Sequence, residues 1–221
     1  MKKTFNILNI ILILAVCVGD ILYMIDRTLL TKSLTSAGFV LLGIINLIYH
    51  CKNHLDHRNF AITMVVGLTF AMLGDIILEI EFIIGAALFA IGHIFYFIAY
   101  CFLLKFQWKD LIYGAVIFVP VTLFIILAPI FDFGGILMEI VCIIYALIIS
   151  CMVGKAISNF VREKSLLHLI ILIGSALFMF SDFMLLLNVF ADMPRVIGIL
   201  CLATYYPAEC LLAFSIYKTN K

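Results

Sequence analysis

The chain of 221 residues is 66% hydrophobic and only 12% charged, with a net charge of +1. Globular domains are about 45–50% apolar and about 25% charged, so this composition excludes a soluble domain and indicates an integral membrane protein. The basic residues are scattered and form no stripe, so nothing indicates nucleic-acid binding.

The apolar segments predict eight membrane-spanning helices, because each contains about 20 mostly apolar residues. The first follows Lys2 and Lys3 and covers residues 5–25, a length that favours a retained helix over a cleaved signal peptide. The others cover residues 33–50, 60–80, 82–104, 110–128, 135–157, 166–189 and 196–217. We therefore expect an all-α membrane protein, a single polytopic domain whose short connections make consecutive helices antiparallel neighbours.

The basic residues indicate how the helices are oriented. If the N-terminus is cytoplasmic, only Arg27, Lys32 and Arg195 lie outside. The remaining 11 of the 14 basic residues then lie inside: Lys2, Lys3, Lys52, Arg58, Lys105, Lys109, Lys155, Arg162, Lys164, Lys218 and Lys221. The positive-inside rule therefore places both termini in the cytoplasm.

Polar side chains gather in the outer halves of the predicted helices. An Asp at the centre of a membrane helix costs about 2.5–3.5 kcal/mol, so such residues are candidates for a functional site. The candidates are Asp20, Lys32, Asp75, Glu79, His93, Tyr96, Ser181, Asp182, Asn188, Tyr205, Tyr206 and Glu209. Six of them, Asp20, Asp75, His93, Asp182, Tyr206 and Glu209, are expected to converge. The inner halves look nearly free of polar residues apart from Asn46.

Some of these candidates also have a purely structural interpretation. Glu79 and Glu81 lie where the third helix turns into the fourth, and we interpret them as turn residues at the interface. A tilted first helix would lift Asp20 to the surface, and His93 alone could be a core histidine bonded to a neighbouring helix. Asp75 and Asp182 remain the strongest candidates.

A weak internal repeat relates the two aspartates. "GDIIL" at residues 74–78 matches "SDFML" at residues 181–185 as a small residue, Asp, two apolar residues and Leu. Each segment precedes an outward-facing hairpin and a helix that begins near Gly85 or Gly198. His93 and Tyr206 follow these glycines by eight residues, and Tyr96 and Glu209 follow by eleven. The pattern predicts that helices 3–4 and 7–8 are parallel repeats whose equivalent faces line one cavity.

A histidine cluster on the cytoplasmic side offers a different kind of site. His50, His54 and His57 are spaced to share a helix face beside Asp56, as metal ligands would be. Basic residues surround them, as in a solvated loop, and the seven cysteines show no ligand spacing. We interpret the histidines as surface residues and expect no metal or cofactor.

Two blocks of sequence resemble the signature regions of the lysoplasmalogenase-like (YhhN) membrane family. They are "MLGDIILEIEFIIGAALFAIGHIFYFIAY" at residues 72–100, and "GSALFMFSDFMLLLNVF" with "TYYPAECLL" within residues 174–212. The resemblance extends over essentially the whole chain. Two departures stand out: Ser33 follows Lys32 where the family often has Pro, and Glu209 stands where it often has Gln.

The resemblance implies hydrolysis of the vinyl-ether bond of a lysoplasmalogen, which gives a long-chain aldehyde and glycerophosphoethanolamine or glycerophosphocholine. Such a reaction needs one protonated carboxylic acid and a second carboxylate as base or charge stabiliser, as in glycosidases. Asp75 and Asp182 are expected to fill these two roles, in an order that the sequence leaves open. His93, Tyr206 and Glu209 are expected to orient water or tune the pair. Lys32 is expected to meet the lipid phosphate.

Two other classes of function remain open: a small-solute or proton-coupled transporter, and a non-catalytic lipid-binding protein. Polar residues in both halves of the membrane would favour transport, whereas a pocket confined to the outer half would favour the hydrolase. The expected partners are a lysophospholipid substrate and membrane lipids, with the oligomeric state open. The Met-Lys-Lys start and the Ile-, Phe-, Lys- and Asn-rich composition indicate the inner membrane of a bacterium.

Overall fold

The computed structural model describes residues 2–53 and 56–219, so His54 and Lys221 lie outside the described residues. Its described part contains eight α-helices: α1 (Lys2–Asp26), α2 (Leu29–Lys52), α3 (Arg58–Leu78), α4 (Phe82–Leu103), α5 (Trp108–Leu127), α6 (Ile136–Arg162), α7 (Leu166–Phe190) and α8 (Val196–Ser215). A short 3₁₀ turn, Ile216–Lys218, follows α8. All eight helices are long and apolar enough to cross a membrane, which confirms a multi-pass, all-α membrane protein.

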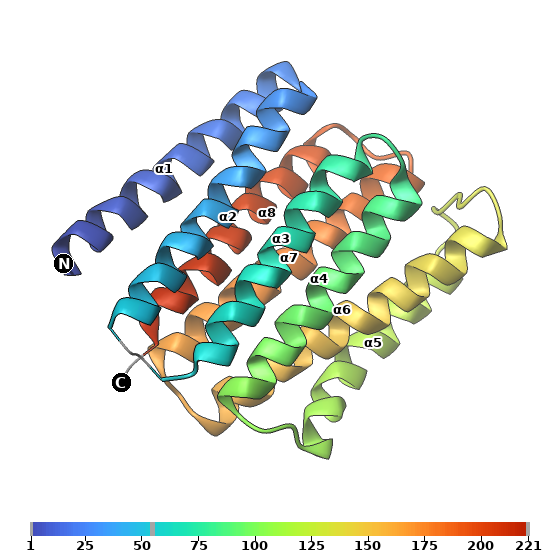
Figure 1. Ribbon diagram of the computed structural model, residues 1–221. Coiled ribbons are helices and arrows are strands. Elements are labelled where there is room, and N and C mark those ends of the chain that lie inside the picture. Colours follow the sequence, from blue (N-terminus) through green and yellow to red (C-terminus); the bar gives the residue numbers. More distant parts are fainter. Residues whose placement is uncertain (1, 54–55, 220–221) are drawn as a thin grey trace.

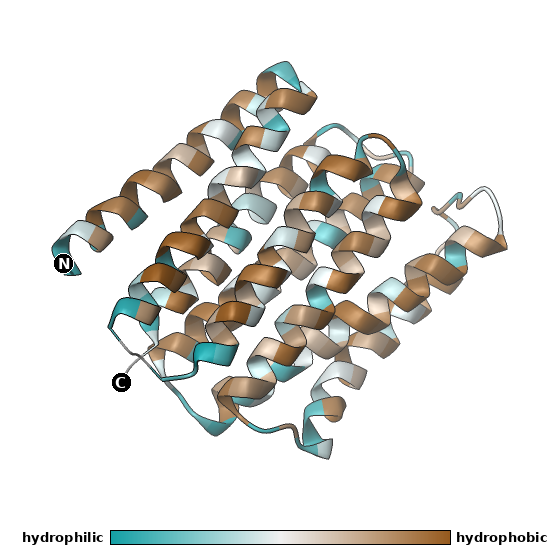
Figure 2. Ribbon diagram, in the orientation of Figure 1, coloured by the Kyte–Doolittle hydropathy of each residue, from teal (hydrophilic) through white to brown (hydrophobic). Residues whose placement is uncertain are grey.

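The helices lie side by side in one bundle, and both chain ends lie at the same end of it (Figure 1). Hydrophobic residues cover most of each helix, whereas hydrophilic residues concentrate at the connections and at isolated positions within the bundle (Figure 2). We call the end opposite the termini the outer end, because the distribution of basic residues assigns it to the outside of the membrane.

Capping residues set the starts of α2 and α4, the first four residues earlier than predicted and the second at the predicted residue. The Thr28 hydroxyl accepts a hydrogen bond from the Thr31 N–H at 3.2 Å, so α2 begins at Leu29 and places Lys32 in its first turn. The Glu81 carboxylate likewise accepts from the Ile84 N–H at 2.9 Å and caps α4. The interpretation of Glu81 as a turn residue is therefore confirmed.

The inner half of the bundle holds more polar residues than the sequence suggested. Lys155 is fully buried, with its ammonium 2.7 Å from the Asp110 carboxylate, and α6 continues beyond it to Arg162. Asn9 and Asn46 exchange side-chain hydrogen bonds at 2.8 Å. The expectation of a nearly apolar inner half was wrong. Both pairs satisfy the hydrogen-bonding needs of buried polar groups, and each pair joins two helices.

The predicted repeat is visible in the packing, since α3 packs along α4 and α7 packs along α8. A glycine lies eight residues before each repeated aspartate and faces the partner helix of its hairpin. A Cβ atom on Gly67 would lie 2.5 Å from the Tyr96 ring, and one on Gly174 would lie 2.9 Å from Leu212. Both hairpins therefore depend on close backbone approach at the same position.

Hydrogen bonds extend the repeat to α2 and α6. The Asn46 amide in α2 donates to the Ala213 carbonyl of α8 at 3.1 Å, and the Asn159 amide in α6 donates to the Tyr100 carbonyl of α4 at 2.8 Å. Ala213 and Tyr100 hold the same place in their hairpins, fifteen residues after the glycine near the start of each helix. Reciprocal contacts of this kind indicate that α1–α4 and α5–α8 are related by an approximate two-fold axis.

A first prediction concerns α5, which packs chiefly against α6. A Cβ atom on Gly154 would overlap the backbone of Gly114, which cannot move aside as a side chain can. We expect Gly154→Ala to lower the free energy of unfolding by about 1–3 kcal/mol, measured by thermal unfolding in detergent. Gly38→Ala is the matched control, because its Cβ would meet only a methyl group of Val16. Equal losses in both variants would contradict this account.

Candidate functional site

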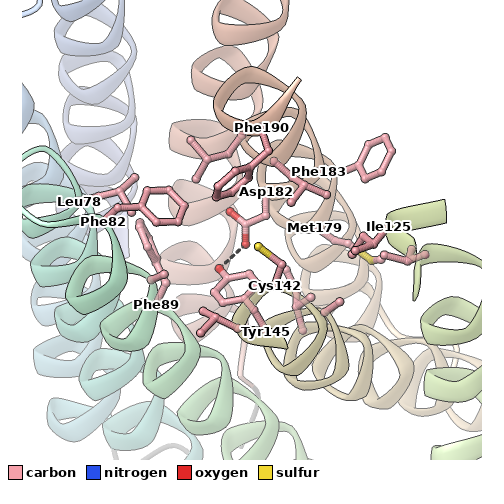
Figure 3. Close-up of a pocket in the computed structure, with 17 residues that line it drawn as sticks. Leu78, Phe82, Phe89, Ile125, Cys142, Tyr145, Met179, Asp182, Phe183 and Phe190 are labelled. Carbon is pink, nitrogen blue, oxygen red and sulfur yellow. Dashed lines mark hydrogen bonds between the residues drawn. The ribbon is translucent and has the colours of Figure 1, made fainter. Parts of the chain in front are cut away.

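Two pockets lie near the outer end of the bundle and share a wall. An apolar pocket with an empty volume of about 700 Å³ lies among α3, α4, α5, α6 and α7 (Figure 3). A polar pocket of about 600 Å³ lies among α1, α2, α3, α4, α7 and α8. The residues that line both are Leu78, Phe89, Asp182 and Leu185. Asp182 is thus the one acidic residue common to the two.

Asp75, in the outer part of α3, lines the polar pocket and is 4% exposed. The Lys32 ammonium lies 3.1 Å from its Oδ1. The hydroxyls of Ser36 and Tyr206 donate to its Oδ2, the latter at 3.0 Å. Both carboxylate oxygens therefore have partners, and a fixed cation compensates the charge.

Glu79 lies in the predicted turn after α3, and it also shares that cation, so it does more than end the helix. Its Oε1 accepts hydrogen bonds from the Lys32 ammonium and the Tyr23 hydroxyl, each at 2.7 Å. Glu79 lies just beyond the end of α3, where burial raises the pKa of its carboxyl. The bonds from Lys32 and Tyr23 and the charge of Lys32 together lower this pKa more, to below its usual value, and so keep Glu79 ionised.

The surroundings of Lys32 consequently differ from those that the sequence suggested. It is 3% exposed, and its ammonium lies between the carboxylates of Asp75 and Glu79. A buried ammonium that already has two anionic partners is not free to bind a lipid phosphate. The expectation that Lys32 would meet the phosphate is therefore not supported by its position.

Asp182 forms a second cluster with residues of α4 and α6. The Tyr145 hydroxyl donates to its Oδ2 at 2.5 Å, and the His93 Nε2 lies 3.2 Å from the same oxygen and 2.9 Å from the Tyr145 hydroxyl. Among the described residues, Oδ1 of Asp182 has no hydrogen-bond partner. Figure 3 shows this oxygen directed away from Tyr145, among the residues that line the apolar pocket.

The two aspartate clusters are built at equivalent positions of the repeat. Lys32 precedes Asn46 by fourteen residues, and Tyr145 precedes Asn159 by the same number. Lys32 of α2 thus contacts Asp75 of α3 in the way that Tyr145 of α6 contacts Asp182 of α7. Each aspartate is also bonded by a residue of the other half, Asp75 by Tyr206 and Asp182 by His93. These two partners are equivalent as well, because each follows the glycine near the start of its helix by eight residues.

The sequence reasoning missed Tyr145. Asn46 and Asn159 were the signal that could have found it, because aligning α2 with α6 on these residues places Tyr145 opposite Lys32. Hydropathy does not reveal this alignment, since both helices are apolar along most of their length.

A third cluster lies apart from both pockets. The Tyr96 hydroxyl donates to Glu209 at 2.7 Å, and both side chains are fully buried. Tyr96 and Glu209 occupy equivalent repeat positions, so this contact lies close to the approximate two-fold axis. Glu209, which was expected to tune the aspartate pair, therefore lines neither pocket.

The remaining candidates divide between the polar pocket and the surrounding core. Ser181, Asn188 and Tyr205 line the polar pocket, and the Ser181 hydroxyl donates to the Cys201 carbonyl at 2.9 Å. Asp20 is buried in α1 but lines neither pocket. The expected single cluster is therefore three separate clusters, and Asp20 belongs to none of them.

The cytoplasmic histidines do not gather into a metal site within residues 2–53 and 56–219. No group of three or more His, Cys, Asp or Glu side chains in that part of the chain is arranged to hold a metal ion. The interpretation of these histidines as surface residues holds for His57, which is exposed, and was wrong for His50, which is buried. A ring nitrogen of His50 lies 2.8 Å from the Asp56 carbonyl, so its partner comes from the segment after α2.

A second prediction follows from the pairing of Lys32 and Asp75. Lys32→Met leaves two carboxylates without their cation, so we expect it to lower the free energy of unfolding by about 3–5 kcal/mol. Lys32→Met combined with Asp75→Asn is expected to recover part of that loss, because the buried charge is removed as well. Thermal unfolding of the single and double variants in detergent measures the coupling. Additive losses would contradict a direct pairing of the two residues.

No curated protein and no solved structure matches the chain significantly. A family model described as the YhhN family matches residues 27–216. The match covers most of the chain, from the turn between α1 and α2 to the end of α8, and includes Asp75, Asp182 and their hydrogen-bond partners. The chain therefore belongs to the YhhN family.

Proposed function

We propose that this protein is a lysoplasmalogenase-type hydrolase, which cleaves the vinyl-ether bond of an alkenyl lysophospholipid to a fatty aldehyde and a glycerophospho-base. One observation carries the proposal: Asp182 lies where an apolar pocket meets a polar one. A lysoplasmalogen has the same division, with its vinyl ether between a hydrocarbon chain and a polar head group. Membership in the YhhN family supports the assignment.

In the proposed mechanism Asp182 is the general acid. Its unbonded Oδ1 carries the proton, while Tyr145 and His93 hold Oδ2 in place. The π electrons of the double bond take that proton onto the alkenyl carbon that is not attached to oxygen, which leaves an oxocarbenium ion. Water adds to the carbon attached to oxygen and returns a proton to the Asp182 carboxylate. As the bond from this carbon to the glycerol oxygen breaks, the hemiacetal hydroxyl gives up its proton and the glycerol oxygen takes one, which releases the aldehyde and the glycerophospho-base.

Asp75 acts as a charge stabiliser in this mechanism. Both of its oxygens have partners and one faces the Lys32 ammonium, so we assign it the role of charge stabiliser and leave that of proton donor to Asp182. Asp75, Glu79 and Lys32 together carry one net negative charge where α2 and α3 line the polar pocket, and Arg27 lines the same pocket from the turn between α1 and α2. A fixed negative charge in a site of low dielectric constant stabilises the oxocarbenium ion that forms beside it.

The placement of polar groups favours hydrolysis over transport. Both pockets lie toward the outer end, whereas the polar groups of the inner half, such as Lys155 and Asn46, are bonded to neighbouring helices. A transporter needs a polar route through both halves of the membrane. We place the enzyme in the inner membrane of a bacterium, with its pockets facing outward.

A third prediction tests the reaction and the role of Asp182. Purified protein is expected to release aldehyde from an alkenyl lysophospholipid, and in D₂O the aldehyde should carry one deuterium on the carbon next to the carbonyl. Asp182→Asn is expected to lower kcat by about 10²–10⁴-fold, the usual contribution of general acid catalysis. Mass spectrometry of the trapped aldehyde measures both results.

Asp192→Asn is the matched control, because Asp192 is exposed in the loop after α7 and lines neither pocket. Its activity should equal that of the unmodified protein. Full activity of Asp182→Asn would refute the proposed acid, and absence of aldehyde from every vinyl-ether lipid would refute the reaction. Asp75→Asn should be active but slower, since it removes a charge and leaves the proton donor in place.

A further inference from the structure

The polar pocket contains two basic residues that differ in their partners. The Lys32 ammonium is held by Asp75 and Glu79. Arg27 lines the same pocket, and no carboxylate of the described residues lies within 4.0 Å of its guanidinium. Arg27 is therefore the cation of this pocket that can accept an anionic ligand.

The turn between α1 and α2 fixes where Arg27 lies. Its backbone has a φ of 49°, in the left-handed region that residues other than glycine rarely adopt. The Arg27 N–H donates to the Tyr23 carbonyl at 3.0 Å, which continues the hydrogen bonding of α1 by one residue. The neighbouring Asp26 carboxylate accepts instead from the Thr28 N–H at 3.2 Å and the Thr31 hydroxyl at 2.8 Å. The nearest acid in sequence is thus used to build the turn.

The position and chemistry of Arg27 suit a phosphate. The turn lies at the outer end of the bundle, between the last residue of α1, Asp26, and the first of α2, Leu29. A guanidinium offers two parallel N–H donors that match two phosphate oxygens, which makes arginine the preferred residue for bidentate phosphate binding.

A second polar side chain, Asn188, lines the same pocket. Gly198 lies against it, where a Cβ atom would be 3.0 Å from the Asn188 Oδ1. A larger residue at position 198 would press on this amide, so the glycine leaves Asn188 free to face the pocket. Its side-chain N–H₂ supplies a neutral donor in the pocket that Arg27 also lines.

We propose that Arg27 and Asn188 form the phosphate-binding subsite for the head group of a lysophospholipid. The identity of the lipid rests on the proposed function, with its hydrocarbon chain in the apolar pocket and its ether oxygen near Asp182. In this arrangement Arg27 determines specificity for phospholipids over neutral glycerol ethers, and Lys32 holds the two carboxylates.

Binding of lipids that cannot be hydrolysed tests the subsite separately from the reaction. The probe is 1-O-hexadecyl-lysophosphatidylethanolamine, which has no double bond to protonate, and its partner without phosphate is 1-O-hexadecylglycerol. We expect Arg27→Gln to raise the Kd of the phosphate lipid about tenfold or more, as for a lost charge-assisted hydrogen bond. The Kd of the glycerol ether should not change. Isothermal titration calorimetry in a non-ionic detergent measures both, whether or not the protein hydrolyses any lipid.

Arg195→Gln is the control, because Arg195 is exposed on the same face of the membrane and lines neither pocket. It should bind both lipids as the unmodified protein does, and Arg27→Lys should lie between Arg27→Gln and the unmodified protein. Equal binding by Arg27→Gln, an equal loss in Arg195→Gln, or a parallel loss for the glycerol ether would overturn the proposal. Glycerophosphoethanolamine should bind much more weakly than the lipid, and equal affinity would show a site for soluble phosphate esters instead.

Discussion

A carboxylate inside a membrane bundle must obtain its hydrogen-bond partners from other helices, because lipid tails supply none. Asp75 in α3 obtains its partners from α2 and α8, and Asp182 in α7 obtains its partners from α6 and α4. These requirements set which helices neighbour α3 and α7 at the outer end of the bundle. The close approach of each hairpin at its glycine then brings the partners within reach.

The two halves of the chain share a framework and differ in the chemistry that they attach to it. Lys32 and Tyr145 occupy equivalent positions, as do Glu79 and Leu186, each four residues after an aspartate. The first member of each pair lines the polar pocket and the second lines the apolar pocket. A few substitutions on a duplicated scaffold thus produce two unlike cavities side by side, which together fit a molecule with a hydrocarbon chain and a charged head.

The fold could be predicted from the sequence almost completely, because span length, apolar content and the placement of basic residues are local properties of the chain. The site could be predicted only in part. Asp75 and Asp182 stood out because acids are rare in apolar segments, whereas Tyr145 looks like any membrane tyrosine. The partnership of Glu79 with Lys32 depends on the register of α3 against α2, which hydropathy does not encode, so the sequence predicted the turn at Glu79 and not its ion pair. Lys32 was misjudged for the same reason.

The crossed hydrogen bonds between the halves have a consequence for how the protein is assembled. Each half supplies one partner to the aspartate of the other half, since Tyr206 of α8 bonds Asp75 and His93 of α4 bonds Asp182. Each half therefore resembles a subunit of an obligate dimer that a connection at residues 104–107 has joined into one chain. Because that connection contributes nothing to either pocket, two fragments separated there and produced in the same cell should find each other in the membrane, whereas either fragment alone would carry an exposed polar seam and be degraded.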